Sequence, residues 1–520
     1  MADQATITSL SNESRVILPK KRWAQQSIIK SFSEYQKIYT FSLKHPDTFW
    51  AEQAKQITWS KQPSKVFRYT KKPLCEWFVG GKLNASFNCL DRHVGEHGNK
   101  VALLWQGEPE LEARAISYQE LLQEVCKFSQ VLLKYGIKKG DRVCLYLPMI
   151  PELVVAMLAC ARIGAIHAVV FGGFSSAALA KRIVDSGAKV LVTADGYYRR
   201  GQIIPLKAQA DEAMQQCRVI RKVLVVKRAG NQCIMASGRD YFWNEELASI
   251  GDRDSIEPEA MDSEDPLFIL YTSGTTGTPK GMVHTTGGYL VYAAYTSKLI
   301  FGLHEHDIFW CTADIGWITG HSYVVYGPLS TGATVVMYEG APDFPAPDRF
   351  WSIIEKFKVT ILYTAPTAIR AFMKSGNDWV LRHNLSSLRL LGSVGEPINP
   401  EAWMWYHRLV GKEQCPVVDT WWQTETGGIL ISPLPGATPL KPGSAAFPLP
   451  GIEAMVVDDR GKCVKANSGG NLVIRGSWPG IARTIWRNPK RYVETYFSQF
   501  KNKYYVTGDG AKIDADGYFW

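Results

Sequence analysis

The sequence predicts an α/β protein, in which mixed or parallel sheets are layered with helices and a smaller β-rich subdomain follows. The length of 520 residues corresponds to roughly three domains of about 150 residues each. Hydrophobic residues make up 46% and charged residues 21%, which is enough for large buried cores and too apolar for disorder. From about residue 84, short β-branched runs alternate with amphipathic segments of helix length. This alternation indicates strands that pair in parallel through helical crossovers.

Residues 1–85 are expected to form a helical arm around a larger body. They contain two segments with helical periodicity, 25–44 and 47–56, which polar and basic stretches connect. The core, residues 86–432, has a predicted strand at 142–147, a helix at 152–163, a strand at 167–171, a helix at 176–185 and a strand at 189–193. It continues with predicted strands at 267–271, 308–312, 333–337, 359–363, 388–391 and 417–420. In sheets of this kind, ligands bind at the carboxyl ends of the strands.

A proline-rich stretch marks the boundary between this core and the β-rich subdomain, residues 433–520. Six prolines fall within the eighteen residues 433–450 and interrupt the alternation. Beyond them, the runs 452–457 and 471–475 predict strands, and the turn sequence Asp458-Asp-Arg-Gly461 follows the first run. We therefore expect a hairpin-rich unit here.

Charge and cysteine usage exclude several classes of protein. The net charge is 59 − 49 = +10, which suits an anionic partner, but the densest basic cluster is only residues 20–22. We therefore expect small-molecule partners and no nucleic acid. The ten cysteines contain no Cys-x-x-Cys pair, so neither a disulfide framework nor a zinc knuckle is predicted. Residues 1–22 lack the apolar run of a signal peptide, and the longest apolar run, 153–161, is too short for a membrane span. We expect a cytoplasmic protein with no membrane partner.

The sharpest motif is Tyr271-Thr-Ser-Gly-Thr-Thr-Gly-Thr-Pro-Lys-Gly281, directly after the apolar run 267–270. Its serine and threonine hydroxyls, glycines and lysine offer backbone N–H groups, side-chain donors and a cation, which together suit a polyphosphate. The motif is not a Walker A loop, because Lys280 is followed by glycine rather than by serine or threonine. The alternative is a flexible surface turn, which rarely has this composition behind a buried strand. The predicted phosphate-binding residues are Thr272, Ser273, Gly274, Thr275, Thr276, Gly277 and Lys280.

This loop resembles the phosphate signature of the adenylate-forming superfamily, which includes the acyl-CoA synthetases, and four further motifs match that superfamily in order. They are Ala313-Asp-Ile-Gly-Trp-Ile-Thr-Gly-His-Ser322, Gly392-Ser-Val-Gly-Glu-Pro397, Asp419-Thr-Trp-Trp-Gln-Thr-Glu-Thr-Gly427 and Tyr505-Val-Thr-Gly-Asp-Gly510. The first of the four is similar to a segment typical of the AMP-forming acetyl-CoA synthetases. The resemblance runs from about residue 19 to residue 520. It implies the large N-terminal domain of the acyl-CoA synthetase fold.

The resemblance also implies a nucleotide site. Its expected residues are Gly395, Glu396, Pro397, Asp419, Thr420, Trp421, Trp422, Gln423, Thr424 and Asp509, with Glu425 as the ligand of Mg²⁺. An ionised Asp419 can accept a hydrogen from the adenine amino group, and Trp421 offers a flat apolar face to the ring. The donors Thr420, Gln423 and Thr424 suit the α-phosphate, and the Glu425 carboxylate suits magnesium. Asp509 offers two oxygens to the ribose hydroxyls, although in a Gly-Asp-Gly sequence it could simply form a turn.

The acid and the thiol substrate are expected in two further places. In acetyl-CoA synthetases the second tryptophan of the nucleotide motif closes the acyl pocket, which implies that Trp422, with Ile318, Thr319 and Val394, leaves room for only a methyl or ethyl group. The alternative is that Trp422 is a core aromatic residue. The segments that match the coenzyme A site contain Gly172, Gly173, Arg199, Arg200, Gly201, Gln202, Thr319 and Asp343. Guanidinium groups bind phosphate in bidentate fashion, although a solvated basic turn is the alternative at 199–200. Gln202 departs from the arginine usual in the family, and Asp343 departs from the usual asparagine.

The reaction that the resemblance implies has two steps and uses ATP, Mg²⁺ and coenzyme A. Acetate is activated to acetyl-AMP with release of pyrophosphate, and the acetyl group passes to coenzyme A with release of AMP. The alternatives are a propionyl-CoA or acetoacetyl-CoA synthetase, or a non-catalytic nucleotide-binding module. The catalytic lysine of the family belongs to a C-terminal domain, and no residue after Asp509 matches it. We therefore expect these 520 residues to bind substrates better than they turn them over.

Overall fold

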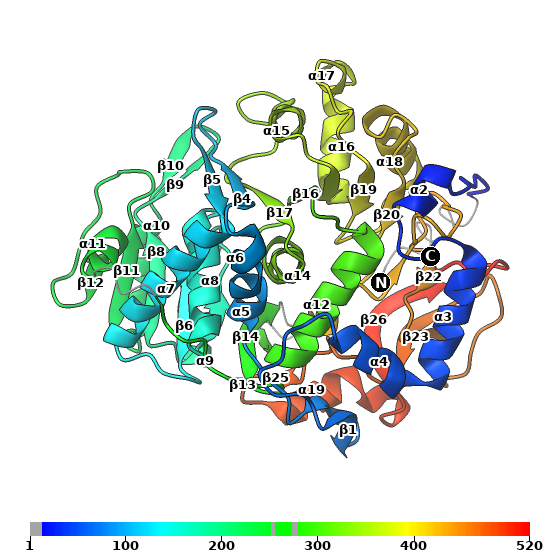
Figure 1. The fold of residues 1–520 in the computed structure, drawn as a ribbon, viewed down its shortest axis with the longest axis horizontal. Coiled ribbons are helices and arrows are strands. Elements are labelled where there is room, and N and C mark those ends of the chain that lie inside the picture. Colours follow the sequence, from blue (N-terminus) through cyan, green and yellow to red (C-terminus); the bar gives the residue numbers. More distant parts are fainter. Residues whose placement is uncertain (1–12, 251–254, 273–278) are drawn as a thin grey trace.

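The computed structural model describes residues 13–250, 255–272 and 279–520, and two large sheets dominate them. Figure 1 shows one of these sheets ending in β11 and β12 at one side of the molecule, far from the C-terminal strands β23 and β26. The eight-stranded sheet has the order β12 (Asp240–Phe242), β11 (Lys222–Val226), β8 (Val190–Ala194), β6 (Arg142–Tyr146), β7 (Ile166–Val169), β14 (Pro266–Thr272), β15 (Lys280–Thr285) and β25 (Thr484–Ile485). Its strands are parallel from β12 to β14, whereas β15 and β25 are antiparallel to their neighbours.

The second large sheet carries the nucleotide motifs. It has seven strands in the order β20 (Val417–Asp419), β19 (Leu390–Ser393), β18 (Ile361–Thr364), β16 (Ile308–Cys311), β17 (Thr334–Tyr338), β4 (Val101–Gln106) and β5 (Ala113–Ser117). All neighbours are parallel except β4 and β5, which form a hairpin. A smaller antiparallel sheet follows, with β23 (Glu453–Val457), β24 (Gly469–Arg475) and β26 (Tyr504–Lys512). Two-stranded pairs complete the described strands: β1 (Lys65–Lys71) with β2 (Leu74–Val79), β3 (Lys82–Leu83) with β13 (Met261–Asp262), β9 (Tyr197–Arg199) with β10 (Gln202–Ile204), and β21 (Ile431–Ser432) with β22 (Phe447–Pro448).

Helices cover both large sheets. The longer ones are α3 (Phe32–Lys44), α4 (Pro46–Ala54), α7 (Tyr118–Lys134), α8 (Pro151–Arg162), α9 (Ser176–Ser186), α10 (Leu206–Gln215), α12 (Thr286–Phe301), α15 (Arg349–Phe357), α16 (Pro366–Ser375) and α19 (Pro489–Tyr496). The shorter ones are α2 (Lys21–Gln25), α5 (Ala85–Cys89), α6 (Asp91–His97), α11 (Trp243–Ala248), α13 (Ile318–Gly320), η1 (His321–Tyr326), α14 (Gly327–Ser330), α17 (Asp378–Leu381), α18 (Pro400–Trp405), η2 (Tyr406–Val410), η3 (Thr424–Thr426) and η4 (Ser498–Phe500). Within the described residues, no helix is both long and apolar enough to cross a membrane.

Local sequence signals explain where several helices begin. Ser117 accepts from the backbone N–H of Glu120 and the Glu120 side chain returns the contact, so a complete capping box starts α7. The first residue of α8 is Pro151. Its missing N–H costs nothing there, because the first N–H groups of a helix have no partner within the helix. Nearly all side chains of α8 are buried, as expected for a helix that is apolar on every face.

The predicted α/β fold class is confirmed, and most predicted strands agree with the structure to within one or two residues. The helical segment expected at 25–44 is the main exception, because α3 begins only at Phe32. There the Ser31 side chain accepts from the backbone N–H of Glu34, which fixes the start of the helix. The strands of the core also form two separate sheets, and β15 enters the first sheet antiparallel.

The proline-rich stretch after residue 432 leads into the small three-stranded sheet, but the chain then returns to the eight-stranded sheet. β25 pairs with β15, where Met282 faces Ile485 and Val283 faces Thr484. The helix α19 follows and packs against β25 and β26. The C-terminal segment is thus tied to the strand that begins at Lys280.

Candidate active site

The predicted nucleotide motifs meet at the carboxyl ends of β18, β19 and β20. The register places Thr364, Ser393 and Asp419 side by side at these ends. The backbone N–H of Val394 donates to Thr364 O at 3.1 Å, and that of Thr420 donates to Ser393 O at 3.1 Å. The adenine-side loop and the motif 419–427 therefore leave the sheet next to each other, as parallel pairing requires.

Asp419 is buried at the end of β20. Burial raises the pKa of its carboxyl to about 8, while hydrogen bonds from Ser393 and the Thr420 backbone act in the opposite direction. The group is therefore mostly protonated at neutral pH, and a protonated carboxyl can donate one hydrogen bond as well as accept others. The role of Asp419 at the adenine amino group stays a prediction.

Asp509 is brought to the same motif by an irregularity in β26. Asn471 faces Gly510 and Val473 faces Val506, so β26 carries extra residues between these pairs. Gly508 lies there with φ of +81°, a left-handed conformation that favours glycine. Asp509 is thus a strand residue on a bulge and not part of a free turn. Its Oδ2 accepts from Trp421 Nε1 at 3.1 Å and from Gln423 Nε2 at 2.9 Å.

Two of the three predicted phosphate donors are engaged in contacts within the protein. Thr420 Oγ1 donates to Ser393 O at 2.8 Å. Gln423 Nε2 donates to Thr507 O as well as to Asp509, and Gln423 Oε1 accepts from Tyr505 Oη at 2.8 Å. A role for these groups at the α-phosphate requires those contacts to rearrange.

Glu425 is buried in η3 beside the predicted phosphate-loop lysine. Its Oε1 accepts from the hydroxyl of Tyr496, which in turn accepts from Lys280 Nζ at 2.7 Å. Lys280 Nζ itself lies 3.8 Å from Glu425 Oε1. No group of three or more potential metal-ligating side chains occurs in the described ranges. A single carboxylate fits Mg²⁺, which usually takes one or two carboxylates together with phosphate and water oxygens.

The structure describes the two ends of the predicted phosphate loop. Thr272 is the last residue of β14 and Lys280 the first of β15. The five predicted residues Ser273, Gly274, Thr275, Thr276 and Gly277 lie outside the described residues. The strands on either side are adjacent and antiparallel, with Thr272 opposite Lys280.

Trp422 packs against two buried tyrosines. Its ring meets Tyr323 edge-on with centroids 5.1 Å apart, and its Nε1 donates to Tyr363 Oη at 3.3 Å. The other predicted wall residues differ in burial: Ile318 and Val394 are buried and Thr319 is partly buried. Ile318 and Val394 belong to the large hydrophobic core against which Trp422 packs, and the place of all four residues in one acyl pocket stays a prediction.

The predicted thiol segment lines a cavity of about 600 Å³. Gly172, Gly173 and Arg199 form part of its wall, and Thr364 at the end of β18 forms another part. The cavity therefore reaches from the thiol segment to the strand next to the acid site. Asp314 also lines it, and burial raises the pKa of this carboxyl to about 6. The other predicted residues of the thiol site, Arg200, Gly201, Gln202, Thr319 and Asp343, are not among its lining residues in the described part of the chain.

Arg199 and Arg200 stand on the β9–β10 hairpin. Arg200 and Gly201 form its turn with φ of +52° and +72°. Arg199 Nη1 donates to Gly340 O at 2.9 Å, and Arg200 Nη2 lies 2.9 Å from Asp343 Oδ1. The unusual Asp343 therefore pairs with an arginine of the predicted phosphate-binding turn. That pairing lowers the net positive charge at the turn.

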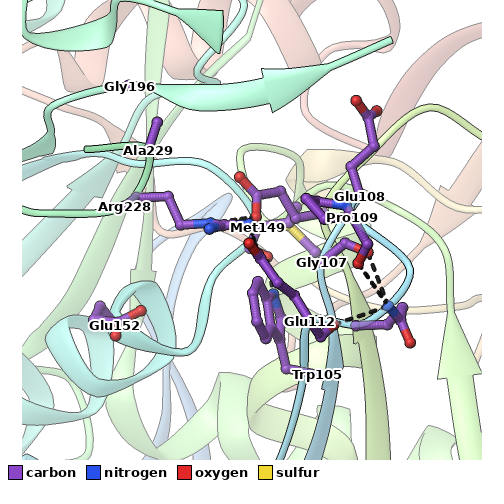
Figure 2. Close-up of polar contacts among 12 residues, drawn as sticks. Trp105, Gly107, Glu108, Pro109, Glu112, Met149, Glu152, Gly196, Arg228 and Ala229 are labelled. Carbon is purple, nitrogen blue, oxygen red and sulfur yellow. Dashed lines mark hydrogen bonds and ion pairs between the residues drawn. The ribbon is translucent and has the colours of Figure 1, made fainter. Parts of the chain in front are cut away.

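A second set of contacts fixes this hairpin from behind. Glu108 is buried and accepts from the backbone N–H of Gly201 at 2.8 Å and from that of Ala341 at 2.9 Å. Figure 2 shows Arg228 reaching over Trp105 toward Glu112, to which it donates at 2.6 Å. These groups, from the loop between β4 and β5 and the end of β11, connect the two large sheets beside the cavity.

Sequence reasoning missed the residues that hold the predicted site residues in position. Tyr496, Tyr505 and Glu108 hold predicted site residues in place, and of the three only Tyr505 lies in a recognised motif. Tyr505 could have been found, because it opens the motif that contains Asp509. His284 and His321 are buried, and they contact the backbone carbonyls of Thr424 and Trp317.

Comparisons with known proteins agree on one family. A family model of AMP-binding enzymes matches residues 90–486, and a model of the acetyl-coenzyme A synthetase N-terminus matches residues 35–89. An acetyl-coenzyme A synthetase of Chlorobaculum tepidum is 52% identical over 516 residues, which cover 99% of this chain and 78% of that protein. One of Aeromonas salmonicida is 53% identical over 98% of this chain and 78% of that protein. One of Streptomyces avermitilis is 57% identical over 91% of this chain and 72% of that protein.

Proposed function

The chain belongs to the AMP-binding enzymes and, among them, to the acetyl-coenzyme A synthetases, and we propose that the junction of β18, β19, β20 and β26 is where it activates acetate. One observation carries this location. Asp509 lies 86 and 88 positions from Gln423 and Trp421 in sequence, yet it accepts hydrogen bonds from both. Two nucleotide motifs of the family therefore form a single site.

The reaction of the family is the ATP-dependent conversion of acetate to acetyl-CoA, with AMP and pyrophosphate as the other products. In the first step an acetate oxygen forms a bond to the α-phosphorus while the bond from that phosphorus to pyrophosphate breaks. In the second step the sulfur of coenzyme A forms a bond to the acyl carbon and AMP leaves. Such reactions depend mainly on positioning and charge neutralisation.

We assign these tasks to particular side chains. Trp421 supplies an apolar face for adenine, and Asp419, at the end of β20, supplies a polar edge. Asp509 accepts the ribose hydroxyl hydrogens. Its hydrogen bonds from Trp421 and Gln423 must then break, or the carboxylate must accept from these side chains and from the ribose together. Lys280 binds phosphate. Glu425 would hold the magnesium ion, which neutralises phosphate charge when bound.

The acid and the thiol approach from opposite ends of one path. Trp422, backed by Tyr323 and Tyr363, is the proposed floor of the acyl pocket. The 600 Å³ cavity beside the β9–β10 hairpin is the proposed channel for the coenzyme A arm, with Arg199 near its anionic end. Both lie at the end of β18, where consecutive side chains point to opposite faces of the sheet: Tyr363 contacts Trp422 and Thr364 lines the cavity.

The organisation of the chain is likewise a proposal. We propose an N-terminal helical arm at 1–85, an adenylate-forming core at 86–432 and a β-rich subdomain at 433–520. The change from the seven-stranded sheet to the small antiparallel sheet supports the second boundary. We further propose a reducing, cytoplasmic location, because all ten cysteines are free thiols, of which seven are buried and two are partly buried. The scattered basic residues support a protein that does not bind nucleic acid.

The test is ATP–pyrophosphate exchange with a panel of acetate, propionate, butyrate and acetoacetate. We expect the highest kcat/KM with acetate, a lower value with propionate and no exchange with the two larger acids. Preference for a larger acid would contradict the acyl pocket assigned to Trp422. Tight ATP binding without acid-dependent exchange, in a protein that also carries the catalytic lysine of the family, would instead favour a nucleotide-binding module.

A further inference from the structure

A tyrosine outside every recognised motif joins the two charged groups of the phosphate site. Tyr496 is the last residue of α19 and is buried. Its hydroxyl accepts from Lys280 Nζ at 2.7 Å and donates to Glu425 Oε1. The lysine and the carboxylate are 3.8 Å apart, whereas a direct charge-assisted N–H···O bond is about 2.7–2.9 Å long. The hydroxyl therefore takes the place of a direct hydrogen bond between the two ions.

The position of this hydroxyl is fixed by its surroundings. The ring of Tyr496 stacks on that of Tyr505 with centroids 5.6 Å apart and an interplanar angle of 18°. Lys280 Nζ lies 4.8 Å from the centroid of the Tyr496 ring. Tyr505 in turn donates to Gln423, two residues before Glu425. Two stacked tyrosines of the C-terminal segment thus hold the motif 419–427.

We propose that Tyr496 is a positioning residue that keeps Lys280 and Glu425 apart, so that the lysine stays able to bind phosphate and the carboxylate stays able to bind magnesium. This rests on the proposed function, which gives those two residues their ligands. A phenolic hydroxyl has one hydrogen, and here that hydrogen points at the carboxylate. Without it, the ammonium and carboxylate groups would approach and neutralise each other. Magnesium and ATP would then have to separate an ion pair before they could bind.

Tyr496→Phe in the full chain tests this directly, because it removes the hydroxyl and keeps the stacked ring. Calorimetry would measure binding of ATP with magnesium, of ATP with EDTA and of AMP. We expect the Kd for ATP with magnesium to rise about tenfold, as for loss of one charge-assisted contact, and the Kd for AMP to change less than about twofold. The magnesium concentration at half-saturation should rise in parallel.

Tyr492→Phe is the matched control. Tyr492 lies one turn earlier on α19, is also buried, and donates to the backbone oxygen of Ala482. Its loss should leave the magnesium dependence of ATP binding unchanged. Thermal melting of both variants would confirm that they fold.

A double-mutant cycle separates positioning from simple packing. Glu425→Gln removes the anion, so no ion pair can form, and Tyr496→Phe should then have no further effect on ATP binding. Additive effects, or equal losses for AMP and for ATP with magnesium, would overturn the proposal. If the parent chain bound neither nucleotide, the proposed function would fail instead, so the two failures are distinguishable.

Discussion

Three carboxylates in this site have three different environments. Asp419 is buried at a strand end, where burial raises its pKa to about 8. Glu425 is buried beside a lysine and a tyrosine hydroxyl. Asp509 is exposed on a bulge and accepts from two side chains. The same chemical group therefore occurs in three environments, which we propose serve as an adenine-edge group, a metal ligand and a ribose acceptor.

Asp509→Ala should weaken AMP binding by at least about tenfold, because charge-assisted hydrogen bonds contribute about 1.5–3 kcal/mol each. Calorimetry with AMP and with 2′,3′-dideoxy-AMP measures this. The parent should discriminate against the dideoxy nucleotide and the variant should not. Asp516→Ala, in the exposed turn after β26, serves as the control. Equal binding of both nucleotides by the parent would reduce Asp509 to a structural residue.

Trp422→Gly should shift the preference from acetate toward straight-chain acids of four or five carbons. Removal of the indole opens space between Tyr323 and Tyr363, and each methylene that fills it contributes roughly 1 kcal/mol. The measurement is kcat/KM for a series of acids. Trp422→Phe keeps an aromatic wall and should retain acetate preference. A glycine variant that loses acetate activity and gains none for longer acids would show that the pocket lies elsewhere.

At the scale of elements, the thiol site depends on a hairpin that cannot hold itself in place. β9 and β10 pair over three residues each, and their turn is exposed. An isolated two-stranded hairpin is marginally stable in water. The buried carboxylate of Glu108 supplies the missing support, since it binds backbone N–H groups of both the hairpin turn and the segment after β17.

Glu108→Gln should therefore raise the KM for coenzyme A about three- to tenfold. The NH₂ group of the glutamine cannot accept a hydrogen bond, so one of the two backbone N–H groups loses its acceptor, at a cost of about 1–2 kcal/mol. ATP–pyrophosphate exchange should stay within about twofold, since the nucleotide site does not contact Glu108. The measurement is steady-state kinetics with varied coenzyme A. Glu110→Gln, an exposed neighbour, is the control. Equal changes in both half-reactions would contradict this role for Glu108.

The elements also show how far the sequence can predict this fold. Strand positions followed from β-branched runs, so residues 142–147 and 471–475 match β6 and β24 closely. The division into two sheets could not be predicted from the sequence, because the residue pattern within a strand does not specify which other strand pairs with it. β25 is two residues long and carries no periodic signal, so its pairing with β15 could not be foreseen.

The same distinction applies to the site. Asp509, Trp421 and Gln423 were predicted from motifs, because groups that touch a ligand recur in recognisable spacing. Tyr496 and Glu108 act through tertiary contacts across more than seventy residues in sequence, so no local sequence motif indicates them. The protonation of Asp419 was also out of reach, since it depends on burial.

At the scale of the whole molecule, a cluster of buried histidines packs on the eight-stranded sheet. His167, His284 and His321 are fully buried around Phe268. Burial lowers the pKa of His284 to about 3 and that of His321 to about 4. In the unfolded chain a histidine has a pKa of about 6.5. Below that pH the unfolded state binds protons that the folded state does not, so the free energy of unfolding falls as pH falls from 6.5 to about 4.

His284 should lower the free energy of unfolding by about 2 kcal/mol as the pH falls from 6.5 to 5, at about 1.4 kcal/mol per pH unit. The raised pKa of Asp419 changes the free energy of unfolding with pH in the opposite direction. The measurement therefore compares His284→Asn with the parent by urea unfolding at each pH. The difference in stability between the two should shrink as pH falls. His306→Asn, at an exposed position, should show a constant difference. A constant difference for His284→Asn as well would show that its folded pKa is near normal.

The pairing of β15 with β25 has a consequence for biosynthesis. During translation, the edge of β15 that β25 covers stays open until about two hundred further residues have left the ribosome. An open strand edge is a template for association with other chains. The residues that close it are followed at once by α19, whose last residue binds Lys280 at the start of β15. Closure of this edge therefore precedes completion of the proposed nucleotide site, which also needs Asp509, so a chain that binds nucleotide should already have covered the edge.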